Sequence, residues 1–356
     1  MTQRPVRPLT WTDARRAIYV DFECLTGKPP HPALLGVLIG ADGKELEQII
    51  TDPRLAPARV AKKERLRVVA AADAGAELVA MALADGRKIV GWSYFDRDRL
   101  IEACPGLEGE IRTTYVNALE LARPWRSTIH PEVRIERADP HSPKHTLDKY
   151  ARLVGYPGAH HLLDATPAKW IRHTLAQLEA KGGNYRRTTS QTKRDWHKLL
   201  EYNRHDLLSL RHITLTAVRE LEAWRAYQRT RFCVDDSGRR ICFMVGSINR
   251  PLQALLKRHD TRQWAFLTAW NPGSIELSQI ENDLRQRDLI AVVESAGYSW
   301  LPAEGVGQDP GWPPEQSLFV LGISRAEARR LGARFDQLAV VVGRRGAPSR
   351  LVRPEA

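Results

Sequence analysis

The chain has 356 residues, 43% of them hydrophobic, so it is long enough for two domains with cores of their own. Its 54 lysine and arginine residues exceed its 42 acidic residues, which gives a formal charge of +12 and favours polyanionic partners. No run of apolar residues approaches the roughly 18 needed for a transmembrane helix, so we expect no membrane partner and a soluble, cytoplasmic protein.

The first predicted strand, residues 17–24 (AIYVDFEC), is apolar and aromatic except at Asp21 and Glu23. Because strand side chains alternate between the two faces of a sheet, both carboxylates emerge on one side, about 7 Å apart. Two negative charges on an otherwise apolar face need a counter-charge, and a divalent cation would supply it. The alternative is a strand end at which both acids are solvated or paired with arginine.

Further strands are expected at residues 34–39 and 46–52, and a helix at residues 62–83. A short apolar strand at residues 89–90 then leads to a helix capped by Ser93, with Asp96 in its first turn. Asp96 is a candidate functional carboxylate, and the alternative is that it only complements the helix dipole.

Residues 113–122 predict a strand that runs into a helix, after which prolines mark an irregular connection that reaches residue 141. The basic segment 181–198 begins with Gly182-Gly183-Asn184, so we expect a flexible loop there. Such a loop, with Tyr185 and Trp196, could track a nucleic-acid backbone, and a merely solubilising loop is the alternative. The candidate phosphate-contacting residues are Arg186, Arg187, Lys193 and Arg194.

Residues 195–210 (DWHKLLEYNRHDLLSL) have apolar positions at spacings of three and four and predict an amphipathic helix. On that helix Tyr202 and Asp206 lie one turn apart and point the same way. The pair can therefore address one point in space.

In chain order, the candidates are Asp-x-Glu on an early strand, Phe-Asp opening a helix and Tyr-x-x-x-Asp on a later helix. This arrangement resembles the tyrosine-type DEDD 3′–5′ exonucleases, a family of polymerase proofreading domains and related ribonuclease-H-like nucleases. Residues 144–155 (KHTLDKYARLVG) are also similar to the helix that such nucleases carry between their second and third motifs. The resemblance covers about residues 14–215 and rests on Asp21, Glu23, Asp96, Tyr202 and Asp206.

The resemblance implies a ribonuclease-H-like α/β domain, a mixed sheet flanked by helices, that cleaves phosphodiester bonds with two Mg²⁺ or Mn²⁺ ions. Asp21 would bridge the ions, and Glu23, Asp96 and Asp206 would complete their ligands. Tyr202 would orient the attacking water. The implied partner is DNA or RNA with a single-stranded 3′ end.

Two departures from the family pattern leave questions open. Ser93 stands where the second motif usually has asparagine, and Asp98 lies close enough to be the true second-motif carboxylate. Histidine-type relatives carry histidine where this chain has Glu201, which favours the tyrosine type.

The remainder of the chain predicts a second, smaller α/β domain, so we expect domains at residues 1–218 and 219–356. Its expected elements are a hairpin over residues 231–245, helices at 250–258 and 278–296, a strand at 264–270 and a helix–strand pair at 324–342. Residues 265–272, which include Ala269-Trp270-Asn271-Pro272, resemble a small bacterial domain family of unknown function, over about residues 222–353. This domain would select the substrate or a protein partner.

Four polar residues of this second domain follow predicted strands and either converge on a pocket or act as turn caps: Asn271, Asn282, Glu315 and Gln337. Four cysteines without metal-ligand spacing are expected to be buried free thiols in a reducing compartment: Cys24, Cys104, Cys233 and Cys242. The sequence therefore predicts a metal-dependent 3′–5′ exonuclease with an accessory domain. The alternative is a nucleic-acid-binding adaptor whose nuclease fold has lost activity.

Overall fold

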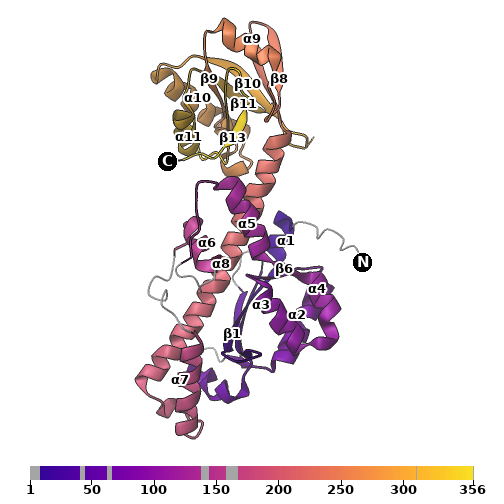
Figure 1. Cartoon of the computed structure of the whole chain (residues 1–356), viewed down its shortest axis with the longest axis vertical. Coiled ribbons are helices and arrows are strands. Elements are labelled where there is room, and N and C mark those ends of the chain that lie inside the picture. Colours follow the sequence, from indigo (N-terminus) through magenta and orange to yellow (C-terminus); the bar gives the residue numbers. More distant parts are fainter. Residues whose placement is uncertain are drawn as a thin grey trace. The chain divides into compact units, whose positions relative to one another are not determined.

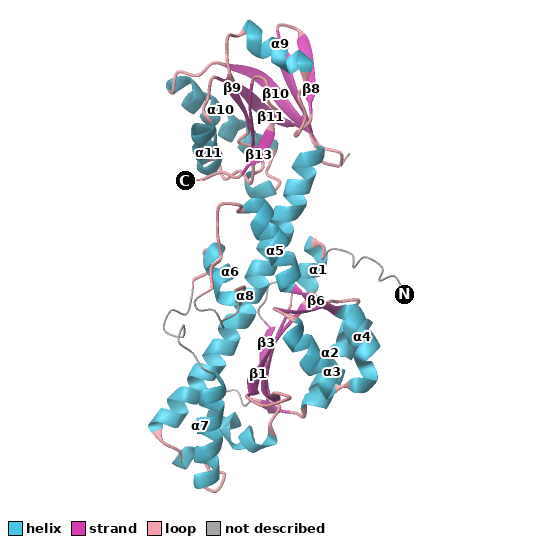
Figure 2. Ribbon diagram, viewed as in Figure 1, coloured by secondary structure: helices cyan, strands magenta, loops and turns pink. Residues whose placement is uncertain are grey.

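The computed structural model describes residues 9–40, 45–61, 66–137, 144–157, 167–309 and 311–355. The chain divides into two compact units, Met1–Arg219 and Glu220–Ala356, and each contains one β-sheet with helices (Figure 1, Figure 2). The expected α/β class is therefore confirmed. Among the described residues, no helix is both long enough and apolar enough to cross a membrane.

The sheet of the first unit has six strands in the order β4-β3-β2-β1-β5-β6. Their bounds are β1 Ile18–Leu25, β2 His31–Ile39, β3 Glu45–Ile50, β4 Arg67–Val68, β5 Ile89–Gly91 and β6 Tyr115–Asn117. Strand β2 is antiparallel to both β1 and β3, whereas β5 and β6 run parallel to β1. The central strand β1 pairs with β5 only at Ile18 and Tyr19, so its far end is free on that side.

Helices cover both faces of this sheet. They are α1 Trp11–Arg16, α2 Ala71–Ala84, α3 Tyr94–Ala103, α4 Glu108–Thr114, α5 Ala118–Ile129, α6 Leu147–Leu153, α7 Pro167–Ala180 and α8 Ser190–Arg229, with short 3-10 turns between some of them. Ile18, Val20 and Phe22 of β1 pack with α2, α3 and α4. Tyr19, on the opposite face, packs with Leu207 and Leu210 of α8. Strand alternation therefore turns Asp21 and Glu23 toward the face that α8 covers.

Three expected element bounds are wrong. The helix expected from residue 62 begins at Ala71, because Arg67–Val68 pairs with β3 as a strand, and residues 62–65 lie outside the described part. The connection expected after residue 122 is helical through Ile129. Pro124 removes one helical hydrogen bond, and the full burial of Trp125 on the same helix outweighs that loss. The basic segment is helical from Ser190 onward.

The second unit contains a seven-stranded sheet in the order β13-β12-β9-β11-β10-β7-β8. Its elements are β7 Arg231–Asp236, β8 Arg239–Phe243, α9 Arg250–Arg258, β9 Gln263–Leu267, α10 Gln279–Ser295, β10 Trp300–Val306, β11 Glu315–Leu321, α11 Arg325–Arg334, β12 Val340–Arg344 and β13 Arg350–Val352. Alternate residues of β9 pack with α10 and α11 on one face and with α9 on the other. The predicted hairpin, helices and strands are present, and β10, β11 and β13 were not predicted.

One cysteine prediction is wrong. Cys233 and Cys242 form a disulfide, because the tight turn at Ser237 and Gly238 sets them directly opposite each other on β7 and β8. Cys24 and Cys104 are free thiols, and Cys104 is buried.

Candidate metal centre

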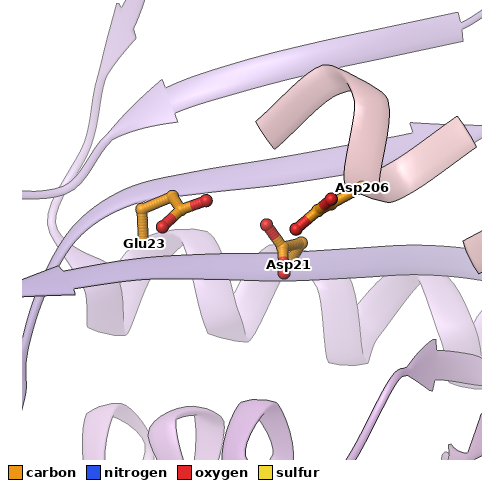
Figure 3. A group of neighbouring side chains, drawn as sticks. All are labelled: Asp21, Glu23 and Asp206. Carbon is orange, nitrogen blue, oxygen red and sulfur yellow. The ribbon is translucent and has the colours of Figure 1, made fainter. Parts of the chain in front are cut away.

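Three acidic side chains from two distant segments meet above the end of β1. Asp21, Glu23 and Asp206 each offer a carboxylate oxygen within 4.8 Å of the others (Figure 3). Asp21 and Glu23 rise from the same face of the strand, and Asp206 comes from α8, which packs on that face through Leu207 and Leu210. Strand alternation and helix packing together therefore place the three acids around one point.

Asp96 lies at the free edge of the same strand. Beyond the point where β5 ends, the first turn of α3 approaches β1, and Asp96 Oδ1 accepts a hydrogen bond of 3.2 Å from the backbone N–H of Phe22. Ser93 caps the helix by accepting from Phe95 N, as expected from the sequence. The side chain of Asp98 instead forms an ion pair of 2.8 Å with Arg97. Geometry thus brings Asp96, and not Asp98, to the Asp21 strand.

Tyr202 lies one helical turn before Asp206 on α8, close enough for each to affect the pKa of the other. Its ring meets the Trp170 ring of α7 edge-on, with 6.4 Å between the ring centroids. Burial, followed by the charges of Asp206, Glu23 and Asp21, raises the pKa of Tyr202 far above the usual range of a phenol. The hydroxyl therefore stays protonated and acts as a hydrogen-bond donor and not as a base.

The carboxyl groups hinder one another's ionisation. Burial raises the pKa of Asp21 to about 6, although hydrogen bonds from Asn203 and Glu23 oppose this shift. Burial and the charge of Asp21 raise the pKa of Asp96 to about 8. The pKa values of Glu23 and Asp206 are also raised, first by burial and then by the Asp21 charge. A bound cation would reverse these shifts, since it favours the ionised form of every ligand.

The donor set fits a hard divalent cation. Carboxylate oxygens are the ligands that Mg²⁺ and Mn²⁺ prefer, and softer nitrogen and sulfur ligands favour other metals. Among the described residues, Asp21, Glu23 and Asp206 form a group that could hold a metal ion, and all three ligands in it are carboxylates. Asp21, Glu23 and Asp206 would hold the ion, and Asp96, bonded to the backbone of the same strand, lies outside this group of three.

The four candidate phosphate-contacting cations lie at the start of α8 and on the turn before it. Arg186, Arg187 and Arg194 are exposed, and Lys193 is half-buried with its ammonium group donating to the Arg186 carbonyl over 2.9 Å. Helical rise places Lys193 and Arg194 about 12–20 Å along the axis from Tyr202 and Asp206. These cations therefore lie outside the acidic cluster, on the same helix.

The two aromatic residues of that basic segment do not present a stacking surface. Tyr185 is 7% exposed and Trp196 is fully buried, and both belong to a core cluster with Leu199 and Leu200. The expectation that they track a nucleic-acid backbone is wrong, because the helix that begins at Ser190 turns Trp196 inward.

Sequence reasoning missed two polar residues of the site, Asn203 and Gln48. The Asn203 side chain is fully buried, and its Nδ2 donates to Asp21 Oδ2 over 2.8 Å. Gln48, which is 3% exposed, donates from β3 to Asn203. The available signal was that Asn203 occupies one of the apolar positions of its helix, where an amide needs a buried partner. The partner itself lies far away in the sequence.

The polar residues singled out in the second unit bond mainly to one another and to the backbone. Asn271 accepts from Asn282 Nδ2 over 2.9 Å and donates to Glu315 Oε1 over 2.7 Å. Gln337 donates to the Trp270 carbonyl over 3.0 Å. Asn271 also has a left-handed backbone, with φ 46°, so this network holds a strained turn in place.

Similarity to known families is limited to the second unit. Residues 267–340 match a family model described as a protein of unknown function (DUF3293), and the match includes the Ala-Trp-Asn-Pro run at residues 269–272. The expected resemblance of this region to a family of unknown function is therefore confirmed over these residues. No curated protein and no solved structure is significantly similar to the chain. The exonuclease resemblance of the first unit stays a prediction.

Proposed function

We propose that Met1–Arg219 is a ribonuclease-H-like domain of the tyrosine-type DEDD class and that it acts as a metal-dependent 3′–5′ exonuclease on DNA or RNA. One observation carries the proposal: Asp21, Glu23 and Asp206 offer oxygens within 4.8 Å of one another. Asp96 and Tyr202, the other two residues of the motif set, lie beside the same group. Packing for stability alone would not gather four carboxyl groups that raise one another's pKa values.

The sheet supports the fold part of the proposal. Strands β1, β2 and β3 are antiparallel and β5 and β6 extend the sheet in parallel, which agrees with the mixed sheet that the resemblance implies.

We also propose that the protein is cytoplasmic. The Cys233–Cys242 disulfide counts against that location, since cytosolic thiols are generally kept reduced.

Each part of the chain then has a role in phosphodiester hydrolysis. Asp21, Glu23, Asp96 and Asp206 would hold two Mg²⁺ or Mn²⁺ ions, which activate water and offset charge on the phosphate and on the leaving 3′ oxygen. Tyr202, held protonated beside Asp206, orients the water through its hydroxyl. The exposed cations near the start of α8 contact the phosphate backbone of a single-stranded 3′ end. The second unit selects the substrate or a protein partner.

The test uses the full chain with 5′-labelled single- and double-stranded DNA and RNA, in Mg²⁺, in Mn²⁺ and in EDTA. We expect a ladder of products shortened from the 3′ end that needs a divalent cation and is abolished by Asp21→Asn with Glu23→Gln. Asp96→Asn should reduce activity by a factor of about 100 or more, since it removes a ligand charge. The matched control is Asp98→Asn on the same helix, which should keep activity within about twofold because Asp98 pairs with Arg97 instead.

The adaptor alternative gives a different result in the same assay. A protein that binds the labelled strands but never shortens them in either cation is a binding module, and the exonuclease proposal then fails. Activity that survives Asp21→Asn with Glu23→Gln would also overturn the proposal, because the hydrolytic centre would lie elsewhere in the chain.

A further inference from the structure

A chain of buried amides, one on β3 and one on α8, reaches the acidic cluster along the face of the sheet that α8 covers. Asn203 Nδ2 donates to Asp21 Oδ2 over 2.8 Å and to the Asp21 carbonyl over 3.2 Å. Asn203 Oδ1 accepts from Gln48 Nε2 over 3.0 Å, and the same Nε2 donates to the Leu200 carbonyl over 2.7 Å. Asn203 is fully buried and Gln48 is 3% exposed, so water does not replace these bonds readily.

The direction of each amide follows from its neighbour. The Leu200 carbonyl can only accept, so Gln48 must present its NH₂ group there and toward Asn203. Asn203 must then turn its oxygen to Gln48 and its NH₂ group to Asp21. A backbone carbonyl of α8 thereby determines which side of Asn203 faces the Asp21 carboxylate.

The sheet leaves room for this chain at one position. Gly36 of β2 lies directly opposite Asp21 in the register of the two strands. A Cβ atom on Gly36 would lie 2.3 Å from Asn203 Oδ1, a distance that no real contact allows. The absence of a side chain at Gly36 therefore lets Asn203 approach the backbone of β1.

We propose that Asn203 and Gln48 are positioning residues: the Gln48-oriented Asn203 amide holds Asp21 Oδ2 so that the remaining Asp21 oxygen is directed to a divalent cation. This inference rests on the proposed function, because it concerns the metal ligand of that same site. Neither residue belongs to the acidic group that would hold the ion. Their effect is to fix the rotamer of Asp21, the acid that would serve both ions.

The test is Gln48→Glu in the full chain, with Mn²⁺ binding measured by calorimetry in the absence of nucleic acid. A carboxylate at position 48 cannot donate, so Asn203 turns over and presents its oxygen to Asp21. We expect Mn²⁺ affinity to fall about tenfold. An added negative charge acting through space alone would instead strengthen cation binding, so the direction of the change identifies the cause.

A second variant and a matched control complete the experiment. Gln48→Met removes the donor without adding charge, and it should weaken Mn²⁺ binding about threefold. Asn282→Asp makes the same kind of exchange at a buried amide of the second unit, which is 3% exposed, and should leave Mn²⁺ affinity unchanged. In the nuclease assay both Gln48 variants should lower kcat with little change in KM, and excess Mn²⁺ should restore most of the loss.

The outcomes separate the two claims. If the unchanged protein binds Mn²⁺ and both folded Gln48 variants bind it equally well, the positioning role is wrong and the proposed function stands. If Gln48→Glu does not fold, Gln48→Met alone decides in the same way. If the unchanged protein binds no Mn²⁺, the proposed function fails, and the positioning role fails with it.

Discussion

The four carboxyl groups at the end of β1 make the cation-free protein sensitive to pH. Their raised pKa values mean that the native state binds more protons than the unfolded chain between about pH 4 and pH 8. Stability then decreases with rising pH over this window, because proton release is easier from the unfolded chain. The contribution of these groups is therefore most favourable at or below pH 4 and is lost as pH passes through their raised native pKa values.

The exchange Asp21→Asn tests whether ionisation of Asp21 lowers the stability of the cation-free protein as pH rises. In the absence of divalent cations, we expect the variant to melt higher than the unchanged protein at pH 8, by about 2–4 °C for each kcal/mol of relieved repulsion. At pH 4.5 Asp21 is largely protonated in the folded protein, and the gain should be less than half of that at pH 8. Asp98→Asn should match the unchanged protein at both values. A gain for Asp21→Asn that is equal at pH 4.5 and pH 8 would contradict the explanation.

Tyr202→Phe separates orientation of water from substrate binding. The hydroxyl of Tyr202 stays protonated beside Asp206, so under the proposed function its loss removes a hydrogen-bond donor next to the metal ligands. We expect kcat to fall by a factor on the order of 100 and KM to change little. Tyr185→Phe is the control, because among the described residues the buried Tyr185 hydroxyl has no hydrogen-bond partner. Equal losses in turnover and binding for Tyr202→Phe would disprove the assigned role.

The junction between β5 and α3 determines where Asp96 lies. Strand β5 ends at Gly91, and the chain turns over the edge of β1 into the first turn of α3. A Cβ atom on Gly91 would lie 2.2 Å from the Tyr115 hydroxyl and 3.0 Å from Asp96 Oδ2. The short strand and the small residue at its end therefore bring a helix terminus close to the acids.

Gly91→Ala should displace Asp96 or Tyr115, because both are buried and cannot move freely. We expect a loss of about 1–3 kcal/mol in the free energy of unfolding, together with weaker cation-dependent activity. Gly109→Ala in α4 is the control, since a Cβ atom there meets no atom within 4 Å. That exchange should raise stability by up to about 1 kcal/mol through helix propensity. Thermal unfolding and the labelled-strand assay measure the two effects, and normal activity in Gly91→Ala would argue against a tight junction.

At the scale of the molecule, each unit has its own sheet and its own core clusters. The acidic cluster belongs to Met1–Arg219, and the Cys233–Cys242 disulfide belongs to Glu220–Ala356. Ligands and redox conditions should therefore affect the two units separately.

Calorimetric unfolding should show two transitions that respond to different additions. Mn²⁺ should raise only the transition of the first unit, because binding stabilises the state that holds the ion. A dithiol reductant should lower only the transition of the second unit, since opening the disulfide frees the unfolded chain. Cys242→Ser should behave like the reduced protein and keep nuclease activity. A single transition that responds to both additions would show that the units unfold together.

Local patterns in the sequence were sufficient for the elements that carry the acids. Alternation along residues 17–24 predicted that Asp21 and Glu23 share a face, and helical spacing predicted that Tyr202 and Asp206 point the same way. Ser93 predicted the helix start that carries Asp96. These features could be predicted because each depends on neighbours within one or two turns or strand repeats.

Contacts between distant segments were decided by the tertiary structure alone. The sequence did not indicate that Gln48 orients Asn203, that Cys233 pairs with Cys242, or that Trp196 turns inward. Strands β10, β11 and β13 were missed for the same reason, since strand pairing depends on partners far away in the chain. The physical cause is that side-chain periodicity specifies which face a residue occupies, whereas packing of whole elements decides what lies opposite that face.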